Sequence, residues 1–68
     1  MTFRTILISP RQRREIVAHV EANPGRTAVE LREAADTARL RMLITDGLRD
    51  LRERSMVRMD EAGRYWAT

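Results

Sequence analysis

The sequence predicts an α+β fold with an N-terminal strand, three helices and a C-terminal β-hairpin. Apolar residues recur at helical spacing in three successive segments, and after Ser55 the pattern changes to two short runs typical of strands around a turn. Thr2 to Ile8 are rich in β-branched and apolar side chains, which favours a short strand before the first helix. These elements fill residues 1–68, so we expect a single domain.

Capping signals mark the first helix. Ser9 is a good N-cap, Pro10 suits the first helical position, and Gln12 completes a capping box with Ser9. Apolar residues then recur at helical spacing until the Asn-Pro-Gly run at residues 23–25, which should stop the helix.

A second capping box begins the second helix. Thr27 is followed three residues later by Glu30, the spacing at which each side chain can bond to the other residue's backbone N–H. The helix is short, and we expect Leu31 and either Ala34 or Ala35 to face the core.

The third helix has the clearest periodicity in the chain. Its apolar stripe consists of Leu40, Leu43, Ile44, Leu48 and Leu51. Either Asp36 or Thr37 can cap it, and it should run to about Arg54. Gly47 lies inside this helix at a cost of about 1 kcal/mol relative to Ala. We therefore expect a neighbouring helix or the N-terminal strand to approach closely there, or the helix to kink slightly.

The C-terminal segment predicts a β-hairpin. Residues 56–59 and 64–67 form two short strand-like runs on either side of an acidic turn that ends in glycine. We expect Tyr65 and Trp66 to join the hydrophobic core, together with Phe3 from the N-terminal strand.

Composition is equally compatible with a nucleic-acid partner and with a bias in codon usage. Thirteen basic residues against ten acidic ones give a formal net charge of +3, and all thirteen are arginine. The planar guanidinium suits bidentate contacts with phosphate and guanine. A coding bias toward arginine in a GC-rich genome would produce the same composition, so the positions of the arginines must decide.

The sequence lacks the residue patterns that metal binding, catalysis, cofactor binding and membrane insertion require. The chain has no cysteine, and His19 is its single histidine, so we expect a structural histidine and no metal site. No serine has a base at a recognisable spacing, and no glycine-rich phosphate loop exists, so we expect neither catalysis nor a cofactor. The longest apolar run, residues 6–8, is far shorter than a membrane span, and no secretory signal is evident, so we expect a cytoplasmic protein.

The order of these elements resembles the winged helix-turn-helix transcription regulators. The residues that carry the resemblance, which covers residues 9–68, are Thr27, Glu30 and Leu31, then Ile44, Leu48 and Leu51, then Met56-Val57 and Tyr65-Trp66. The resemblance implies a three-helix winged fold that binds double-stranded DNA. The third helix, at about residues 38–54, would enter the major groove and the hairpin would form the wing.

Two features depart from that family. The stretch from Glu30 to Ile44 is longer than the family's tight turn needs, so the third helix should begin a turn early or follow a loose turn. The hairpin turn carries Asp60 and Glu61, which phosphates repel, whereas wings that enter DNA usually bear basic residues. We therefore expect this wing to stay outside the groove.

The candidate DNA contacts lie off the apolar stripes. On the third helix they are Arg39, Arg41, Met42, Thr45 and Arg49. At the start of the second helix Arg26 and Thr27 are expected to contact a phosphate, and on the hairpin arms Arg58 and Arg64 are expected to contact the DNA backbone.

Each candidate also has a purely structural interpretation. Arg49 can pair with Asp46 or Glu53, and Asp50 with Arg54, on a solvated helix. Capping accounts for Thr27, and an ordinary exposed sheet face accounts for the arginines of the hairpin.

The sequence leaves a second class of function open. Acidic residues on the third helix and the hairpin favour a protein–protein interaction module without DNA binding; they are Asp46, Asp50, Glu53, Asp60 and Glu61. In either case we expect a homodimer. Operators are usually read by two-fold dimers, and the segment Thr2 to Ile8 has apolar residues on both faces.

Overall fold

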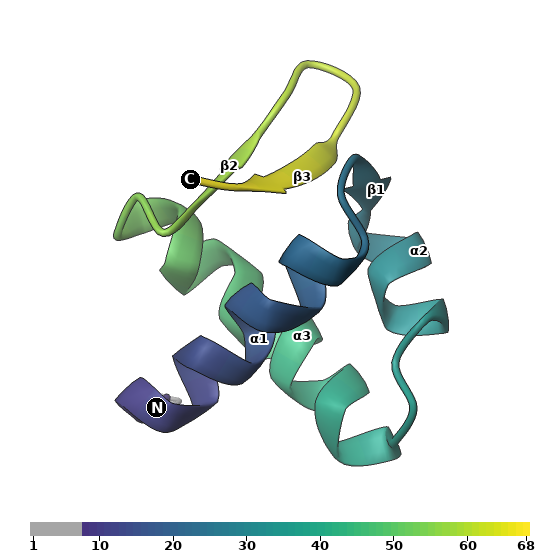
Figure 1. Ribbon diagram of the computed structural model, residues 1–68, viewed down its shortest axis with the longest axis vertical. Helices are drawn as coiled ribbons and strands as arrows, with labels where there is room; N and C mark the ends of the chain where they lie inside the picture. The colour runs from purple at the N-terminus through teal and green to yellow at the C-terminus, as the bar shows by residue number, and fades with distance from the viewer. Residues whose placement is uncertain (1–7) are drawn as a thin grey trace, which may run out of the picture.

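The computed structural model describes residues 8–68, which form three helices and a small three-stranded antiparallel sheet (Figure 1). The elements are α1 (Pro10–Ala22), β1 (Arg26–Thr27), α2 (Ala28–Glu33), α3 (Ala38–Glu53), β2 (Val57–Met59) and β3 (Arg64–Ala67). The α+β class is confirmed, as are three helices followed by a hairpin. Of the predicted N-terminal strand, residues 2–7 lie outside the described residues, and so does Phe3.

The predicted capping boxes form the starts of α1 and α2. The Ser9 hydroxyl accepts a hydrogen bond from the Gln12 N–H at 3.2 Å, and the Ser9 N–H donates to Gln12 Oε1 at 3.0 Å. Thr27 and Glu30 repeat this reciprocal pattern at 3.3 and 3.0 Å. Of the two candidate caps for α3, Thr37 is used, because its hydroxyl accepts from the Leu40 N–H at 3.1 Å.

A left-handed residue ends α3 and turns the chain into the hairpin. Ser55 has φ 60°, a conformation more usual for glycine. Its N–H donates to the Arg52 carbonyl at 3.1 Å, and the next N–H, of Met56, donates to the Leu51 carbonyl at 2.9 Å. This pair of bonds satisfies the last carbonyls of the helix and fixes where β2 begins.

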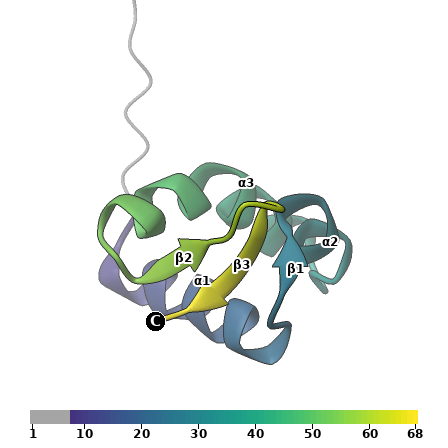
Figure 2. The ribbon, with the colours of Figure 1, turned by 90° about the horizontal axis from the view of Figure 1, so that it is seen from above.

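The sheet has the order β1-β3-β2 and lies against the helices (Figure 2). β2 and β3 form the predicted hairpin, in which Arg58 faces Trp66. The third strand, β1, comes from the residues just before α2, and the sequence did not predict it. Gly25, with φ 73°, begins this pairing, because its N–H donates to the Tyr65 carbonyl at 3.0 Å.

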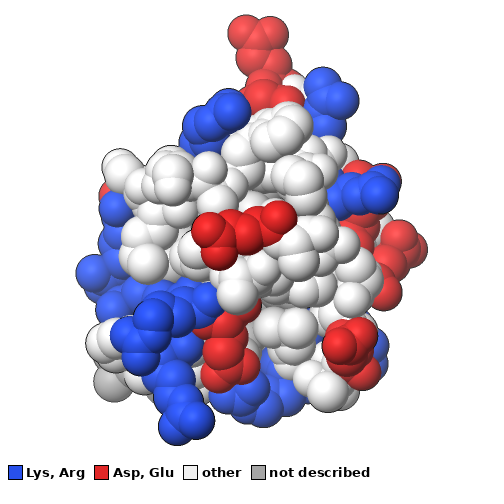
Figure 3. Space-filling model, viewed as in Figure 1, with Lys and Arg blue, Asp and Glu red and all other residues white. Residues whose placement is uncertain are grey.

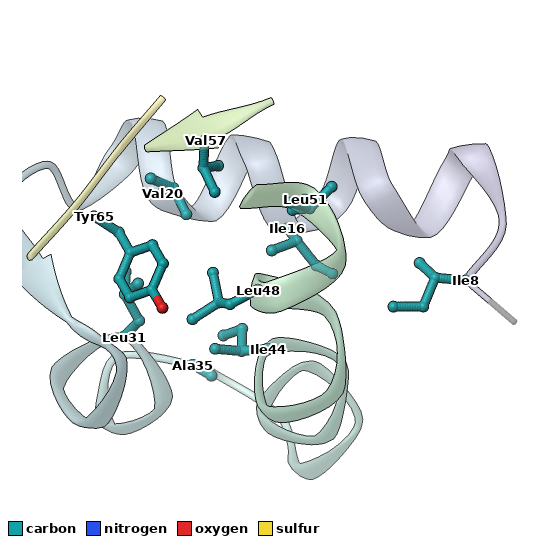
Figure 4. Close-up of a cluster of buried hydrophobic side chains, with 10 residues drawn as sticks. All are labelled: Ile8, Ile16, Val20, Leu31, Ala35, Ile44, Leu48, Leu51, Val57 and Tyr65. Atoms are coloured by element: carbon teal, nitrogen blue, oxygen red, sulfur yellow. The ribbon is translucent and has the colours of Figure 1, made fainter. Parts of the chain in front are cut away.

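One hydrophobic cluster joins all the helices to the hairpin (Figure 4). Its buried members are Ile8, Ile16, Val20, Leu31, Ala35, Ile44, Leu48, Leu51, Val57 and Tyr65. Ala35 is buried and Ala34 exposed, which decides between the two candidates on α2. Leu40 and Leu43 are half-buried at the edge of the cluster.

The expectation that Trp66 joins the core is wrong. Tyr65 is buried, but its neighbour along β3 lies on the opposite face of the strand, as the two-residue period of a strand requires. Trp66 is half-buried there, with its ring against Gly25 and beneath the guanidinium of Arg58, which lies 5.4 Å from the ring centroid.

The glycine inside α3 lies at a close crossing. A Cβ atom at Gly47 would be 2.5 Å from Ile16 Cδ1 of α1 and 2.9 Å from Ile8 Cδ1. Both distances are shorter than real Cβ contacts. The expected close approach at Gly47 is therefore confirmed, and both α1 and the residue preceding its cap make it.

Gly47→Ala should lower the free energy of unfolding, although Ala is the better helix former by about 1 kcal/mol. Overpacking a filled core typically costs about 1–3 kcal/mol, and two isoleucine methyl groups must shift to make room for the new Cβ. Ile16→Val removes the nearer methyl group. In an Ile16→Val background, Gly47→Ala should therefore cost less than it does in the wild type.

Urea denaturation of the wild type, both single variants and the double variant, followed by far-UV circular dichroism, measures this coupling. The tight crossing would be contradicted if the changes in the free energy of unfolding caused by Gly47→Ala and Ile16→Val were strictly additive. A Gly47→Ala variant more stable than the wild type would contradict it as well.

Candidate nucleic-acid interface

The outer side of α3 faces solvent along its whole length. Ile44, Gly47, Leu48 and Leu51 form its buried side. On the opposite side Met42 is 63% exposed and the Arg49 side chain 82% exposed. Of the predicted contacts, Met42, Thr45 and Arg49 lie on this exposed side.

Acidic residues share the exposed side and moderate its charge. Arg49 Nε lies 3.7 Å from a carboxylate oxygen of Glu53, one turn along the helix, which is the pairing that a purely structural interpretation predicts. Both side chains are mostly exposed, so this pair is weakly held and Arg49 stays accessible to an incoming anion. The Thr45 hydroxyl donates to the Arg41 carbonyl at 2.9 Å.

On the flank of α3 that faces α1, the cations are engaged. Arg39 donates two hydrogen bonds to the Glu15 carboxylate, at 2.8 and 3.1 Å. These bonds lower the pKa of Glu15 and raise that of Arg39. Arg54 pairs with Asp50 as predicted, at 3.1 Å. Arg39 must therefore leave Glu15 before it can bind another anion.

The flank that faces α2 and the hairpin carries two arginines without carboxylate partners. Arg41 Nη1 donates to the Ala35 carbonyl at 3.4 Å, and Arg52 Nη1 lies 3.3 Å from the Met59 sulfur of β2. Among residues 8–68, no carboxylate oxygen lies within 4.0 Å of either guanidinium. Sequence reasoning missed Arg52, because its place beside the hairpin depends on how β2 folds back.

The start of α2 is already occupied by a carboxylate. Glu30 accepts a hydrogen bond from the Thr27 N–H at 3.0 Å and lies 3.8 Å from Arg26 Nη1. The bond from the Thr27 backbone is the main reason that the pKa of Glu30 is lowered. A phosphate at this position would compete with Glu30 for Arg26 and Thr27.

Asp60 stabilises the hairpin turn from within. Its carboxylate accepts hydrogen bonds from the Ala62 N–H at 3.0 Å, the Arg64 N–H at 2.9 Å and Arg64 Nε at 3.1 Å. The bond from the Arg64 backbone is the largest cause of its lowered pKa. Arg64 is thus paired within the hairpin. Glu61, which is exposed, has no basic group within 4.0 Å in the described part of the chain.

The predicted contacts therefore fall into separate groups. Arg41, Met42, Thr45 and Arg49 lie on the exposed side and one flank of α3, whereas Arg39 is turned toward α1. Arg26 and Thr27 lie at the start of α2. Arg58 and Arg64 lie on the hairpin.

Comparison with protein-family models, with characterised proteins and with solved structures finds no match to this chain. The interpretation of the interface therefore rests on its own geometry.

The described residues offer few other kinds of site. Over residues 8–68 there is no detectable pocket and no group of three or more side chains arranged to hold a metal ion. His19 is half-buried, and its Nε2 lies 2.8 Å from the Leu31 carbonyl, which ties α1 to α2. None of the helices in this part of the chain is long and apolar enough to cross a membrane.

Asp60→Asn should lower the melting temperature, because the amide keeps an acceptor oxygen but loses the negative charge that faces Arg64. Glu61→Gln, a matched change at the neighbouring position, should leave the melting temperature unchanged.

The stabilisation that Asp60 contributes should decrease as the pH falls. The pKa of Asp60 in the folded chain lies below its ordinary 3.8, so its stabilisation is complete above that value and is lost as the pH falls through the folded pKa. Thermal unfolding over a pH series should therefore show less acid destabilisation in the Asp60→Asn variant. Equal melting temperatures for the two variants at neutral pH would contradict the role of Asp60 in the turn.

Proposed function

We propose that this chain is a small winged helix-turn-helix protein that binds double-stranded DNA with the exposed side of α3 in the major groove. The observation that carries the proposal is the two-sided character of α3. One side is buried in the core, while the other presents Met42 and Arg49 to solvent along a helix that the rest of the described fold leaves uncovered. The element order and the sheet order β1-β3-β2 also support a winged fold.

The chemistry of this surface fits a DNA groove. The major groove is wide enough to admit an α-helix. Arg49 and Arg41 have guanidinium groups suited to guanine edges or phosphates, and Met42 can pack against a thymine methyl group. Thr45 supplies a small polar contact between them. The protein would act by occupying an operator, as a transcription regulator in the cytoplasm, and not by catalysis.

The hairpin has a secondary part in this proposal. Arg58 is exposed over Trp66, a position from which it can contact the backbone beside the groove, whereas Arg64 must first leave Asp60. The charge of Glu61 at the turn keeps the hairpin tip away from phosphates.

A protein-docking function remains the second candidate. It is favoured by the exposed Met42 and by the acidic residues Asp46 and Glu53 on the same helix. Apolar and mixed-charge contacts of this kind depend weakly on salt, whereas DNA binding by arginines depends on it steeply. Salt dependence therefore separates the two functions.

Arg49→Ala and Arg41→Ala should each weaken binding to the preferred DNA site by about 1–3 kcal/mol, because each removes an accessible guanidinium from the groove-facing helix. Arg39→Ala is the matched control on the same helix, and it should have the smaller effect because Glu15 already holds that side chain. Circular dichroism checks that each variant is folded.

The measurement is a gel shift against a pool of genomic fragments at two salt concentrations, followed by titration of the best fragment. The proposal fails if the wild type binds no duplex at low salt. The assignment of the groove-facing side fails if the Arg41→Ala, Arg49→Ala double variant keeps wild-type affinity.

We further propose a homodimer, because one small domain contacts a single half-site and operators are usually read by two-fold pairs. Sedimentation equilibrium should show a dimer for the full chain. A variant that begins at Ile8 should be monomeric if the preceding residues form the interface. This start keeps Ile8, which packs against Gly47. A monomeric full chain at high micromolar concentration would overturn the dimer, and a dimeric truncation would place the interface elsewhere.

A further inference from the structure

A second group of arginines lies outside the α3 surface. Arg11, Arg13 and Arg14 come from the first turns of α1, and Arg54 follows the end of α3. We call these four residues the α1 basic patch. Figure 3 shows basic side chains gathered toward the left and lower left of the molecule, over the N-terminal end of α1, while single basic and acidic side chains are scattered over the rest of that face.

One carboxylate joins the two helices within the patch. Asp50 accepts from Arg13 Nε at 3.3 Å and from Arg54 Nε at 3.1 Å, so two guanidinium groups share a single negative charge. The nearby Glu15 is bound to Arg39.

Four arginines less Asp50 leave a local charge of +3, which equals the formal net charge of the whole chain. That whole-chain value includes Arg4, which lies outside the described residues. Over residues 8–68, twelve arginines against ten acidic residues give +2, so the described residues outside the patch carry −1 and the basic excess of this part lies in the patch.

Arg11 and Arg14 form no ion pair in the described part of the chain. Both are exposed, and neither has a carboxylate oxygen within 4.0 Å in the part of the chain that the structure describes. The first turn of α1 contains no acidic residue, and cations at the start of a helix are disfavoured by its dipole. Arg11 lies in this first turn, where its charge opposes the helix dipole, and it is attracted to Glu15 one turn along without forming an ion pair. Arg14 lies just past the first turn and forms no ion pair in the described fold.

The composition of the patch favours a polyanion over a protein surface. Protein interfaces centre on buried apolar or aromatic side chains. The large exposed apolar residues of the described chain are Val29, Met42 and Met59; none of them lies on α1, and Met42 lies in the first half of α3, far from Arg54 at its other end. A patch whose exposed groups are guanidiniums suits the regular phosphates of a nucleic-acid backbone.

The position of the patch relates it to α3. The contacts Arg13–Asp50 and Glu15–Arg39 place the first half of α1 beside one flank of α3, next to its exposed side. We propose that the α1 basic patch binds DNA phosphates that flank the groove occupied by α3, without regard to base sequence. This inference rests on the proposed function, because α3 supplies the docking of the same duplex.

The test is the salt dependence of DNA affinity for the Arg11→Gln, Arg14→Gln double variant. The slope of the logarithm of the binding constant against the logarithm of salt concentration changes by about 0.9 for each phosphate contact, so losing two should reduce it by about 1.8. The affinity ratio between the preferred site and a scrambled duplex should stay at the wild-type value, because the patch reads no bases.

A charge-restored variant separates a local contact from a general effect of net charge. Adding Glu21→Gln and Glu33→Gln to the double variant returns the formal charge to +3 through two exposed residues of α1 and α2 that have no ion pair in the described fold. The slope should stay reduced in this quadruple variant. Recovery of the wild-type slope would overturn the proposal.

The remaining outcomes distinguish the two proposals. An unchanged slope in the double variant overturns the phosphate-binding role alone, and this is the result expected if the patch instead binds an acidic protein. A wild type that binds no duplex at any salt concentration overturns the proposed function, and the patch proposal with it.

Discussion

The close crossing of α1 over α3 at Gly47 determines which side of α3 is open to solvent. Without a Cβ at this position, the methyl groups of Ile16 and Ile8 reach the α3 backbone. That approach buries one side of α3 and leaves the opposite side open to solvent. It also places Glu15 against Arg39 and Arg13 against Asp50, one ion pair toward each end of α3. The packing of a single glycine thus sets both the accessible helix surface and the charges bordering it.

The same crossing divides the arginines of α3 by availability. Arg39 faces α1 and is held by a carboxylate, whereas Arg41 and Arg52 face α2 and the hairpin and are held only by a carbonyl oxygen and a sulfur atom. A phosphate offers a guanidinium a charged partner, which a neutral acceptor does not. In the proposed DNA complex, contacts from the second group should therefore contribute more to affinity than contacts from the first. A helical wheel drawn from the sequence separates Arg39 from Arg41 and Arg52, but it does not show which of them has a carboxylate partner.

Local signals in the sequence were sufficient for most of the fold. The caps at Ser9 and Thr27 involve partners three residues away, so their chemistry can be seen in the sequence itself. The strand β1 could not be predicted in this way, because two residues show no period and their partners, Tyr65 and Arg64, lie far along the chain. Trp66 was misplaced for a related reason: adjacent aromatic residues on a strand point to opposite faces, and only one of them can enter the core.

The sequence predicted most of the residues that form the candidate site, but it did not predict which of their charges are neutralised by neighbouring groups. Asp60 looked like a repulsive charge on the hairpin, yet its carboxylate accepts from backbone N–H groups and from Arg64, so much of that charge is satisfied inside the turn. Asp50 shows the reverse case: it looked like a partner for Arg54 alone, but it also accepts from Arg13 of another helix, which leaves two arginines for one carboxylate. The electrostatic surface of a small domain is therefore decided by ion pairs between elements, and these exist only once the helices have packed.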